Sequence, residues 1–298
     1  MSKWSYTVTP DDAGLTLKEI IRRNFTFSSR MMTRFKQNGC ISVNGETVRI
    51  SVLPDPGDIV SISLPDERSG FDPQDVPIAP VHEDDDLLII DKPAGYTVHP
   101  TKGHPAGTIA NGLAKYIADT GQTFKVRFVN RLDMDTSGLL VIAKSAFCQD
   151  RIINQMKEDA VVKKYIAVVN GVLEDDEGKI EAPVGRPDPE KAKRGVTRTG
   201  SASVTRFSVI ERYKRHTLVE LDLKTGRTHQ IRVHMSHIGH PVTGDRLYGG
   251  EDVLLIERQA LHACYISFLH PVTGEPVEAA AEIPEDMKRL IEKIRSYE

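Results

Sequence analysis

The chain has few cysteines and no long apolar run, and each absence narrows what the protein can be. Its 298 residues include three cysteines, which lie far apart at Cys40, Cys148 and Cys264. An odd, scattered set argues against a disulfide framework and favours a reducing cytoplasm, and no CxxC pair suggests a zinc ribbon. No apolar stretch approaches the roughly 20 residues that cross a bilayer, and the N-terminus does not resemble a secretory signal. We therefore expect a cytoplasmic protein without a membrane segment.

The net charge of −3 gives no sign of a nucleic-acid-binding protein, but it is an average over very uneven segments. Residues 14–63 carry seven Lys or Arg and four Asp or Glu, whereas residues 65–86 carry eight acids and one Arg. Residues 191–198 carry no acid and four basic residues: Lys191, Lys193, Arg194 and Arg198. Because local charge decides what a surface attracts, the two basic segments are candidates for contact with a polyanion.

The first basic segment has the pattern of a small α/β domain. Residues 14–37 predict two short helices, the first capped by Thr16 and the second carrying Arg30, Arg34 and Lys36. Residues 39–49 predict a hairpin around an Asn-Gly turn, and a further strand is expected before residue 64. The acidic, Pro-containing residues 64–80 have the composition of a linker. We therefore expect a domain over residues 14–63 and a second one over residues 81–298.

The second domain is expected to be of the α+β class with a largely antiparallel mixed sheet, because strands outnumber helices and several alternate polar with apolar residues. Strands are predicted within residues 86–95, 138–145, 163–171, 204–212 and 216–226. Helices are predicted over residues 108–119, 146–158 and 227–239.

A first polar cluster, NRLDMDTSG at residues 130–138, lies directly before an apolar strand. Asp133 and Asp135 are two residues apart, and Thr136, Ser137 and Gly138 can hold such a loop rigid through hydroxyl and backbone hydrogen bonds. Asp-rich loops are more often turns or solvated caps than catalytic sites. The residue types alone leave both possibilities open.

A second polar cluster, TGRTHQIRVH at residues 225–234, is expected to join the end of a strand to a helix that starts with Arg227. Helix N-termini attract anions, and Arg227 would add a positive charge there. A capped helix with a solvated basic face is the plainer alternative. His234, His237 and His240 are spaced by three, but no nearby acid or cysteine completes a metal site, so hydrogen-bonded or RNA-facing histidines are favoured.

Four motifs in order resemble the RluA family of pseudouridine synthases. In chain order they are DKPAGYTVHP, NRLDMDTSGLLVIAKS, KKYIAVVNG and LKTGRTHQIRVHMSHIGHPVTGDRLYG, and they are distributed within residues 81–280. The family usually has His where this chain has Asn130. We interpret this difference as a change that adjusts the loop before Asp133 without abolishing activity. Residues 14–63 resemble the S4 RNA-binding domain that often precedes this catalytic domain.

The resemblance implies an isomerase that converts uridine in RNA to pseudouridine, with Asp133 as the catalytic carboxylate. Arg232 is the first choice for the cation that pairs with Asp133, and Arg227 is the second. Tyr165 matches the family tyrosine that stacks on the base, although a strand aromatic needs no such role. A carboxylate can add to the ribose or the base, or remove a proton on an elimination route, and both routes stay open. No metal or organic cofactor is implied, because the reaction is redox-neutral and uses no external group.

The partner implied is RNA, with ribosomal RNA favoured and transfer RNA as the alternative, bound by a monomer. Flipping the target base costs a few kcal/mol, which contacts to phosphates would offset. The residues expected to bind RNA are Arg30, Arg34, Lys36, Lys191, Lys193, Arg194, Arg198 and Arg227. Two other functions compete: a non-catalytic RNA-binding or ribosome-assembly protein, and a hydrolase of free nucleosides that uses Asp133 and Asp135.

Overall fold

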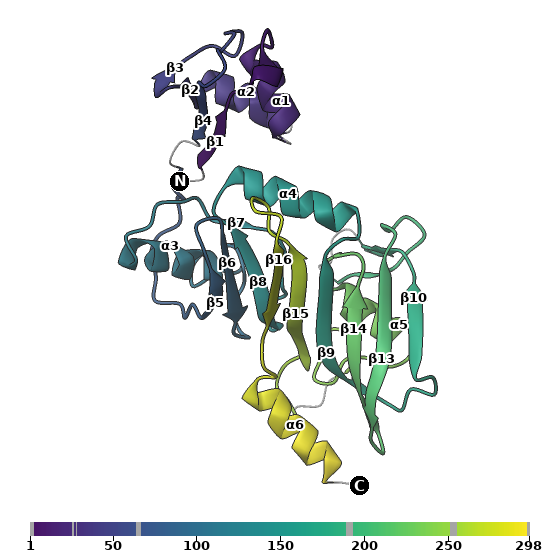
Figure 1. Ribbon diagram of the computed structural model, residues 1–298. Helices are drawn as coiled ribbons and strands as arrows, with labels where there is room; N and C mark the ends of the chain where they lie inside the picture. The colour runs from purple at the N-terminus through teal and green to yellow at the C-terminus, as the bar shows by residue number, and fades with distance from the viewer. Residues whose placement is uncertain are drawn as a thin grey trace.

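The computed structural model describes residues 3–25, 27, 29–63, 67–188, 193–250 and 255–296, and for Ser29, Arg30 and Arg34 it describes the backbone alone. Two main sheets organise this part of the chain, one of four strands and one of ten. We call residues 3–63 the N-terminal module and residues 67–296 the sheet body. Figure 1 shows the module at one end of the molecule and the last helix at the other. No helix among the described residues is both long and apolar enough to span a bilayer.

The N-terminal module packs two helices against a small sheet of strand order β1-β4-β2-β3. The elements are β1 (Lys3–Thr7), the short 3-10 helix η1 (Pro10–Asp12), α1 (Leu17–Asn24), α2 (Ser29–Gln37), β2 (Ile41–Val43), β3 (Glu46–Thr47) and β4 (Ile59–Ser63). Thr16 caps α1 as predicted, because its hydroxyl accepts the backbone N–H of Glu19 and its own N–H reaches the Glu19 carboxylate. Asn44 and Gly45 turn the predicted hairpin with φ of 52° and 88°.

The module contains one strand that the sequence pattern did not predict. β1 pairs with β4 along its whole length, so the folded unit extends to residue 3 and does not begin at residue 14. Trp4 on β1 also contacts the sheet body: its ring centroid lies 4.8 Å from that of Phe147, and the Phe27 ring lies 5.3 Å from Phe147. These aromatic contacts join the module to the sheet body through one apolar cluster.

Residues 67–79, expected to belong to a linker, lie against the sheet body. Val76 is buried beside the core under α3 (Ile109–Asp119), and the Gln74 backbone N–H donates to Asn111 on that helix. Glu67 forms an ion pair with Arg127. This acidic stretch therefore contributes to the packing of the sheet body.

The sheet body is built on a mixed, largely antiparallel sheet of order β10-β13-β14-β9-β15-β8-β6-β5, with β16 beside β15 and β7 beside β8. Only the β15–β8 pair is parallel among the described strands. The predicted α+β class is confirmed. The strands are β5 (Pro80–Glu83), β6 (Leu87–Lys92), β7 (Arg127–Phe128), β8 (Ser137–Ala143), β9 (Val162–Asn170), β10 (Glu177–Glu181), β13 (Val204–Arg212), β14 (His216–Leu223), β15 (Leu261–Leu269) and β16 (Pro276–Ala280), with β11 (Val184–Gly185) and β12 (Gly195–Val196) as a separate pair.

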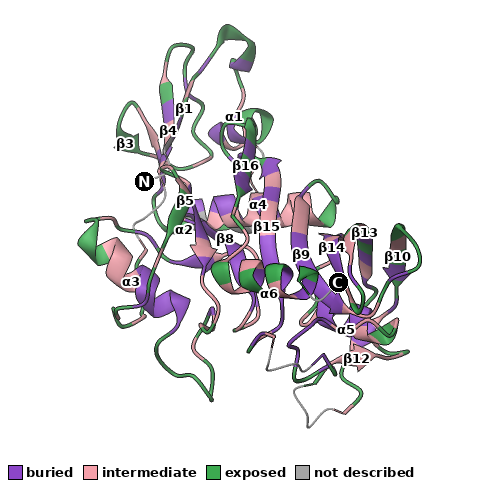
Figure 2. Cartoon of the chain, turned by 90° about the horizontal axis from the view of Figure 1, so that it is seen from below, coloured by how far each residue is buried: buried purple, intermediate pink, exposed green. Residues whose placement is uncertain are grey.

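The middle strands of this sheet form the core. All seven residues of β8 are buried, as an internal strand covered on both faces requires. Figure 2 shows the central strands as mainly buried, while exposed residues gather on loops and on the outward faces of helices. The remaining helices are α4 (Ala146–Lys157), α5 (Gln230–His237) and α6 (Glu285–Arg295).

Two predicted elements differ from the structure. The helix expected from Arg227 begins at Gln230, because His229 has a left-handed backbone with φ of 58° that ends the preceding loop. The basic stretch at residues 191–198, for which no strand was predicted, contains strand β12, in which Gly195 and Val196 pair with Gly185 and Val184.

Candidate active site

Asp133 lies in a loop between β7 and β8 that is fixed mainly through its backbone. The N–H of Thr136 donates to the carbonyl of Asp133, which closes a turn. The fully buried Lys92 donates from Nζ to the carbonyls of Met134 at 2.8 Å and Thr136 at 2.9 Å, and to its neighbour Pro93. Burial lowers the pKa of Lys92 to about 7, although the nearby carboxylates act against that shift. Lys92 therefore fixes the backbone of the Asp133 loop through these hydrogen bonds.

Asn130 anchors the start of the same loop. Its Nδ2 donates to the carbonyl of Leu139, and its Oδ1 accepts the N–H of Val141, so the side chain pairs with β8 as a strand would. Arg258 holds the other side by donating from Nη1 to the carbonyl of Asp135 at 3.0 Å. Gly138 is the second residue of β8 and has φ of 111°, and a Cβ there would lie 2.3 Å from the carbonyl oxygen of Ala263.

The guanidinium of Arg232 on α5 pairs with Asp133. Arg232 Nη1 lies 2.8 Å from Asp133 Oδ2, and both groups are largely buried. The same guanidinium donates from Nε and Nη2 to both carboxylate oxygens of the fully buried Asp245, at 2.6 and 2.9 Å. The structure thus brings the first-choice cation to Asp133. Arg227, the second choice, is exposed, and its backbone N–H donates to Gln230.

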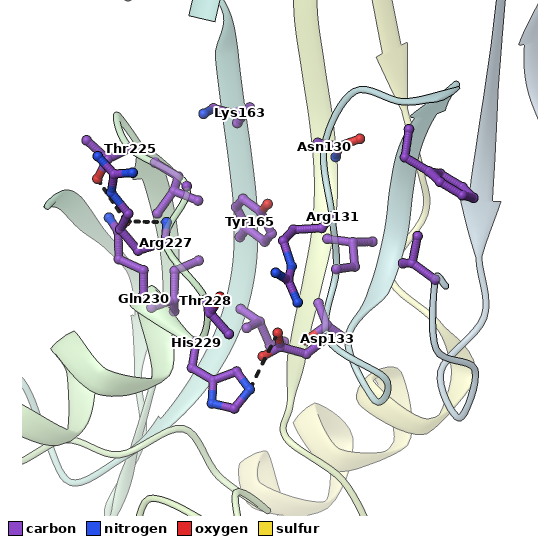
Figure 3. A pocket seen from close by; sticks show the side chains of 18 of the residues that line it. Asn130, Arg131, Asp133, Lys163, Tyr165, Thr225, Arg227, Thr228, His229 and Gln230 are labelled. Carbon is purple, nitrogen blue, oxygen red and sulfur yellow. Dashed lines mark hydrogen bonds and ion pairs between the residues drawn. The ribbon is translucent and has the colours of Figure 1, made fainter. Parts of the chain in front are cut away.

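Tyr165 and His229 complete the surroundings of the carboxylate (Figure 3). Tyr165 is buried on β9, and burial followed by the negative charge of Asp133 raises the pKa of its phenol. His229 Nε2 lies 3.8 Å from Asp133 Oδ1, and its Nδ1 is 2.9 Å from the hydroxyl of Tyr248. Burial lowers the pKa of His229 despite the carboxylate beside it, which favours the neutral imidazole.

Asp133, Tyr165, His229 and Arg232 line a cleft of about 1010 Å³. Its walls come from the Asp133 loop, α4, β9 and the loop between β14 and α5, so residues far apart in the sequence face one space. Five basic residues on these walls, besides Arg232, are Arg131, Lys157, Lys163, Lys224 and Arg227. The arrangement offers one held carboxylate in a cleft suited to an anionic ligand.

Comparison with known proteins identifies the family. Residues 86–237 match the family described as RNA pseudouridylate synthase. The chain is 42% identical over 275 residues to "Uncharacterized RNA pseudouridine synthase YlyB" of Bacillus subtilis, covering 90% of both proteins. The chain belongs to the RluA-type RNA pseudouridine synthases. It is therefore an isomerase that forms pseudouridine in RNA.

Two further comparisons agree with this assignment. The synthase is 38% identical over 304 residues to "Ribosomal large subunit pseudouridine synthase D" of Xanthomonas campestris, covering 97% of this chain and 92% of that protein. The solved structure of "Human RNA Pseudouridylate Synthase Domain Containing 4" superposes with a TM-score of 0.59 at 23% identity, covering 73% of this chain and 93% of that one. That likeness shows the fold.

The residues predicted to bind RNA are divided between the two parts of the synthase. Lys36 is exposed on α2, the side chains of Arg30 and Arg34 are outside the described residues, and so is Lys191. Lys193 and Arg194 lie close to the active site, because both contact Tyr248. Lys193 Nζ is 5.5 Å from the centre of the Tyr248 ring, and the Arg194 N–H donates to the Tyr248 hydroxyl. Arg198 is exposed.

Two of the three histidines that raised the question of a metal have other partners. His234 contacts the Thr205 hydroxyl and the Ala182 carbonyl, and His240 contacts the carbonyl of Asn170. Within the described ranges, no three His, Cys, Asp or Glu residues come together in a metal-binding arrangement.

Sequence reasoning missed three residues of the site: Lys92, Asp245 and Tyr248. Asp245 and Tyr248 belong to the quoted GDRLYG stretch, and polar residues between Gly244 and Gly249 indicate a shaped turn. Lys92 precedes a proline at the end of a buried strand, where a lysine is unusual. These signals point to structural importance, but spacing alone does not give their partners.

Proposed function

We propose that this synthase isomerises specific uridines of large-subunit ribosomal RNA, with Asp133 as the catalytic carboxylate. The choice of RNA rests on the relative of that name, which matches nearly the whole chain. Transfer RNA is the alternative substrate. The role of Asp133 rests on one observation above all: Arg232 holds its carboxylate in the wall of the basic cleft.

The reaction makes a clear demand on this site. The bond from the ribose C1′ to N1 of uracil breaks, the base turns, and C1′ bonds to C5 while C5 loses a proton and N1 gains one. A carboxylate that adds to the ribose or base must be ionised, and so must one that removes a proton on an elimination route. Arg232 Nη1, 2.8 Å from Asp133 Oδ2, supplies a positive charge that pairs with such a carboxylate. Both routes are compatible with this geometry.

Tyr165 is proposed to hold the flipped base. Its raised phenol pKa keeps the hydroxyl protonated at neutral pH, so the ring offers an uncharged aromatic surface beside Asp133. Stacking of a base on an aromatic side chain contributes about 1–3 kcal/mol, enough to offset much of the cost of unstacking that base. The reaction needs no metal or organic cofactor, because it is redox-neutral and uses no external group.

RNA binding is proposed to involve both parts of the chain. The N-terminal module, which includes the predicted residues 14–63, would act as an S4-like RNA-binding domain, and residues 64–80 would connect it to a catalytic domain over residues 81–298. The helix–helix–hairpin order and the exposed Lys36 support the first assignment. Lys193, Arg194, Arg198 and Arg227 would contact phosphates near the cleft. The protein would act as a monomer in the cytoplasm.

The test is turnover by Asp133→Asn, with Asp135→Asn as the matched control. Single-turnover pseudouridine formation would be measured on unmodified transcripts of large-subunit ribosomal RNA and of transfer RNA. Asp133→Asn should lose all measurable turnover while binding RNA nearly as the unchanged protein does, and Asp135→Asn should be much milder. Turnover by Asp133→Asn within tenfold of normal, a difference of about 1.4 kcal/mol in the barrier, would refute the assignment. Modification of transfer RNA alone would refute the choice of substrate.

A further inference from the structure

Two adjacent lysines of β9 have different surroundings. Lys163 and Lys164 occupy consecutive strand positions, so their side chains point to opposite faces of the sheet. Lys164 Nζ pairs with Glu220 on the neighbouring strand β14, at 2.8 Å. Lys163 lies on the face of Tyr165, two residues away, and lines the cleft (Figure 3).

Lys163 has no direct partner there. Among the residues that the structure describes, none forms a hydrogen bond or an ion pair with its Nζ. Asp159 and Asp222 are near enough to act on its charge, but both lie closer to Lys224, at 3.7 and 3.2 Å. Burial lowers the pKa of Lys163. A partly buried ammonium without a partner is unfavourable until a ligand supplies an acceptor.

We propose that Lys163 binds a backbone phosphate of the RNA beside the target uridine. The inference rests on the proposed function, since it takes Tyr165 as the seat of the flipped base. Two residues of a strand span about 7 Å, which is on the scale of a single nucleotide. Lys163 lines the cleft together with the apolar side chains of Ile153 and Met156. A phosphodiester is the anionic group that a nucleotide in this cleft carries.

The role predicted is in binding and not in chemistry. Each phosphate that a cation neutralises contributes roughly 0.7–0.9 to the slope of log affinity against log salt. Between 50 and 200 mM salt, the RNA affinity of a variant that lacks one contact should therefore fall about threefold less than that of the unchanged protein. The single-turnover rate at saturating RNA should stay within about threefold of normal.

The experiment compares three variants in the full chain. Dissociation constants for a transcript of large-subunit ribosomal RNA would be measured at several salt concentrations for Lys163→Met, Lys163→Arg and Lys164→Met. Lys163→Met should lower the slope, Lys163→Arg should restore it, and Lys164→Met should leave it unchanged. A merely structural lysine would alter the melting temperature without changing the slope.

An unchanged slope in Lys163→Met, or a loss that Lys163→Arg does not restore, overturns the proposal. An equal loss in Lys164→Met also overturns it, because the effect would then not be specific to the cleft face. Failure of the proposed function is read separately, as absence of turnover on that transcript by the unchanged protein. The slope is a binding measurement, so it tests Lys163 whichever RNA is modified.

Discussion

The carboxylates of Asp133 and Asp245 share one guanidinium, that of Arg232. Asp245 takes Nε and Nη2, which leaves Nη1 for Asp133. Asp245 also accepts the backbone N–H groups of Leu247 and Tyr248, so its position is fixed by the chain itself. The turn that begins at Asp245 therefore orients the guanidinium of Arg232 toward Asp133.

Asp245→Asn should reduce turnover although Asp245 lies behind the arginine. The amide cannot accept two charge-assisted hydrogen bonds, so Arg232 would lose its fixed orientation. We expect the single-turnover rate at saturating RNA to fall at least tenfold, and the free energy of unfolding to fall by about 3 kcal/mol. Asp245→Glu keeps the charge and should recover part of the rate. A normal rate in Asp245→Asn would show that the pair serves stability alone.

Lys92 should make stability depend on pH above neutrality. The pKa of Lys92 is about 7 in the folded chain and about 10.4 in an unfolded one. Between these values the unfolded state binds one more proton, so the free energy of unfolding rises with pH, by at most about 1.4 kcal/mol per unit. Lys92→Met should abolish this rise between pH 7.5 and 9.5 in denaturant titrations. Lys164→Met is the control, and equal slopes in all three proteins would contradict the prediction.

Gly138→Ala should destabilise the seam between β8 and β15. The added Cβ would lie 2.3 Å from the Ala263 carbonyl, and φ of 111° is unfavourable for alanine. Overpacking and backbone strain together should cost at least about 2 kcal/mol in chemical unfolding. Gly70→Ala has open space around its Cβ and is the control. Similar unfolding midpoints for the two variants would contradict the prediction.

Removal of the N-terminal module should leave an apolar patch on α4. Trp4 and Phe27 cover Phe147, so a chain that begins at residue 67 exposes that ring. We expect the shortened protein to bind a hydrophobic dye and to bind RNA more weakly with a smaller salt slope. Phe147→Ser in the shortened chain should remove dye binding without restoring RNA affinity. Unchanged salt dependence after the deletion would argue against an RNA role for the module.

Local signals predicted the elements of the fold, and contacts distant in sequence decided the rest. The Thr16 cap and the Asn44–Gly45 turn depend on neighbouring residues, so the sequence pattern predicted them correctly. β1 was missed because a five-residue strand gives a weak signal, and its partner β4 lies more than fifty residues away. The register of a strand pair depends on that partner.

The same distinction holds at the active site. The motif resemblance predicted Asp133, Tyr165 and Arg232, which the structure brings to one cleft. It gave no reason to connect Lys92 with carbonyls 42 and 44 residues further along. The start of α5 was misplaced because a non-glycine residue, His229, adopts a left-handed backbone that residue preference disfavours.

Arg232→Met should damage chemistry more than binding, whereas changing Lys193, Arg194 and Arg198 together to Met should do the reverse. Removing Arg232 leaves Asp133 and Asp245 as buried carboxylates without their shared cation, at a cost of roughly 3–5 kcal/mol. The single-turnover rate at saturating RNA should fall more than a hundredfold, while the salt slope of RNA affinity should change little.

The three basic residues should act by contacting phosphates. Their loss should lower the slope of log affinity against log salt by about 2–3, and should leave the single-turnover rate at saturating RNA near normal. The backbone N–H of Arg194 that binds the Tyr248 hydroxyl survives these substitutions, so the surroundings of His229 should persist. A normal saturated rate in Arg232→Met would mean that Asp133 works without this cation. The exposed Arg227 would then be the next cation to test, by the same pair of measurements.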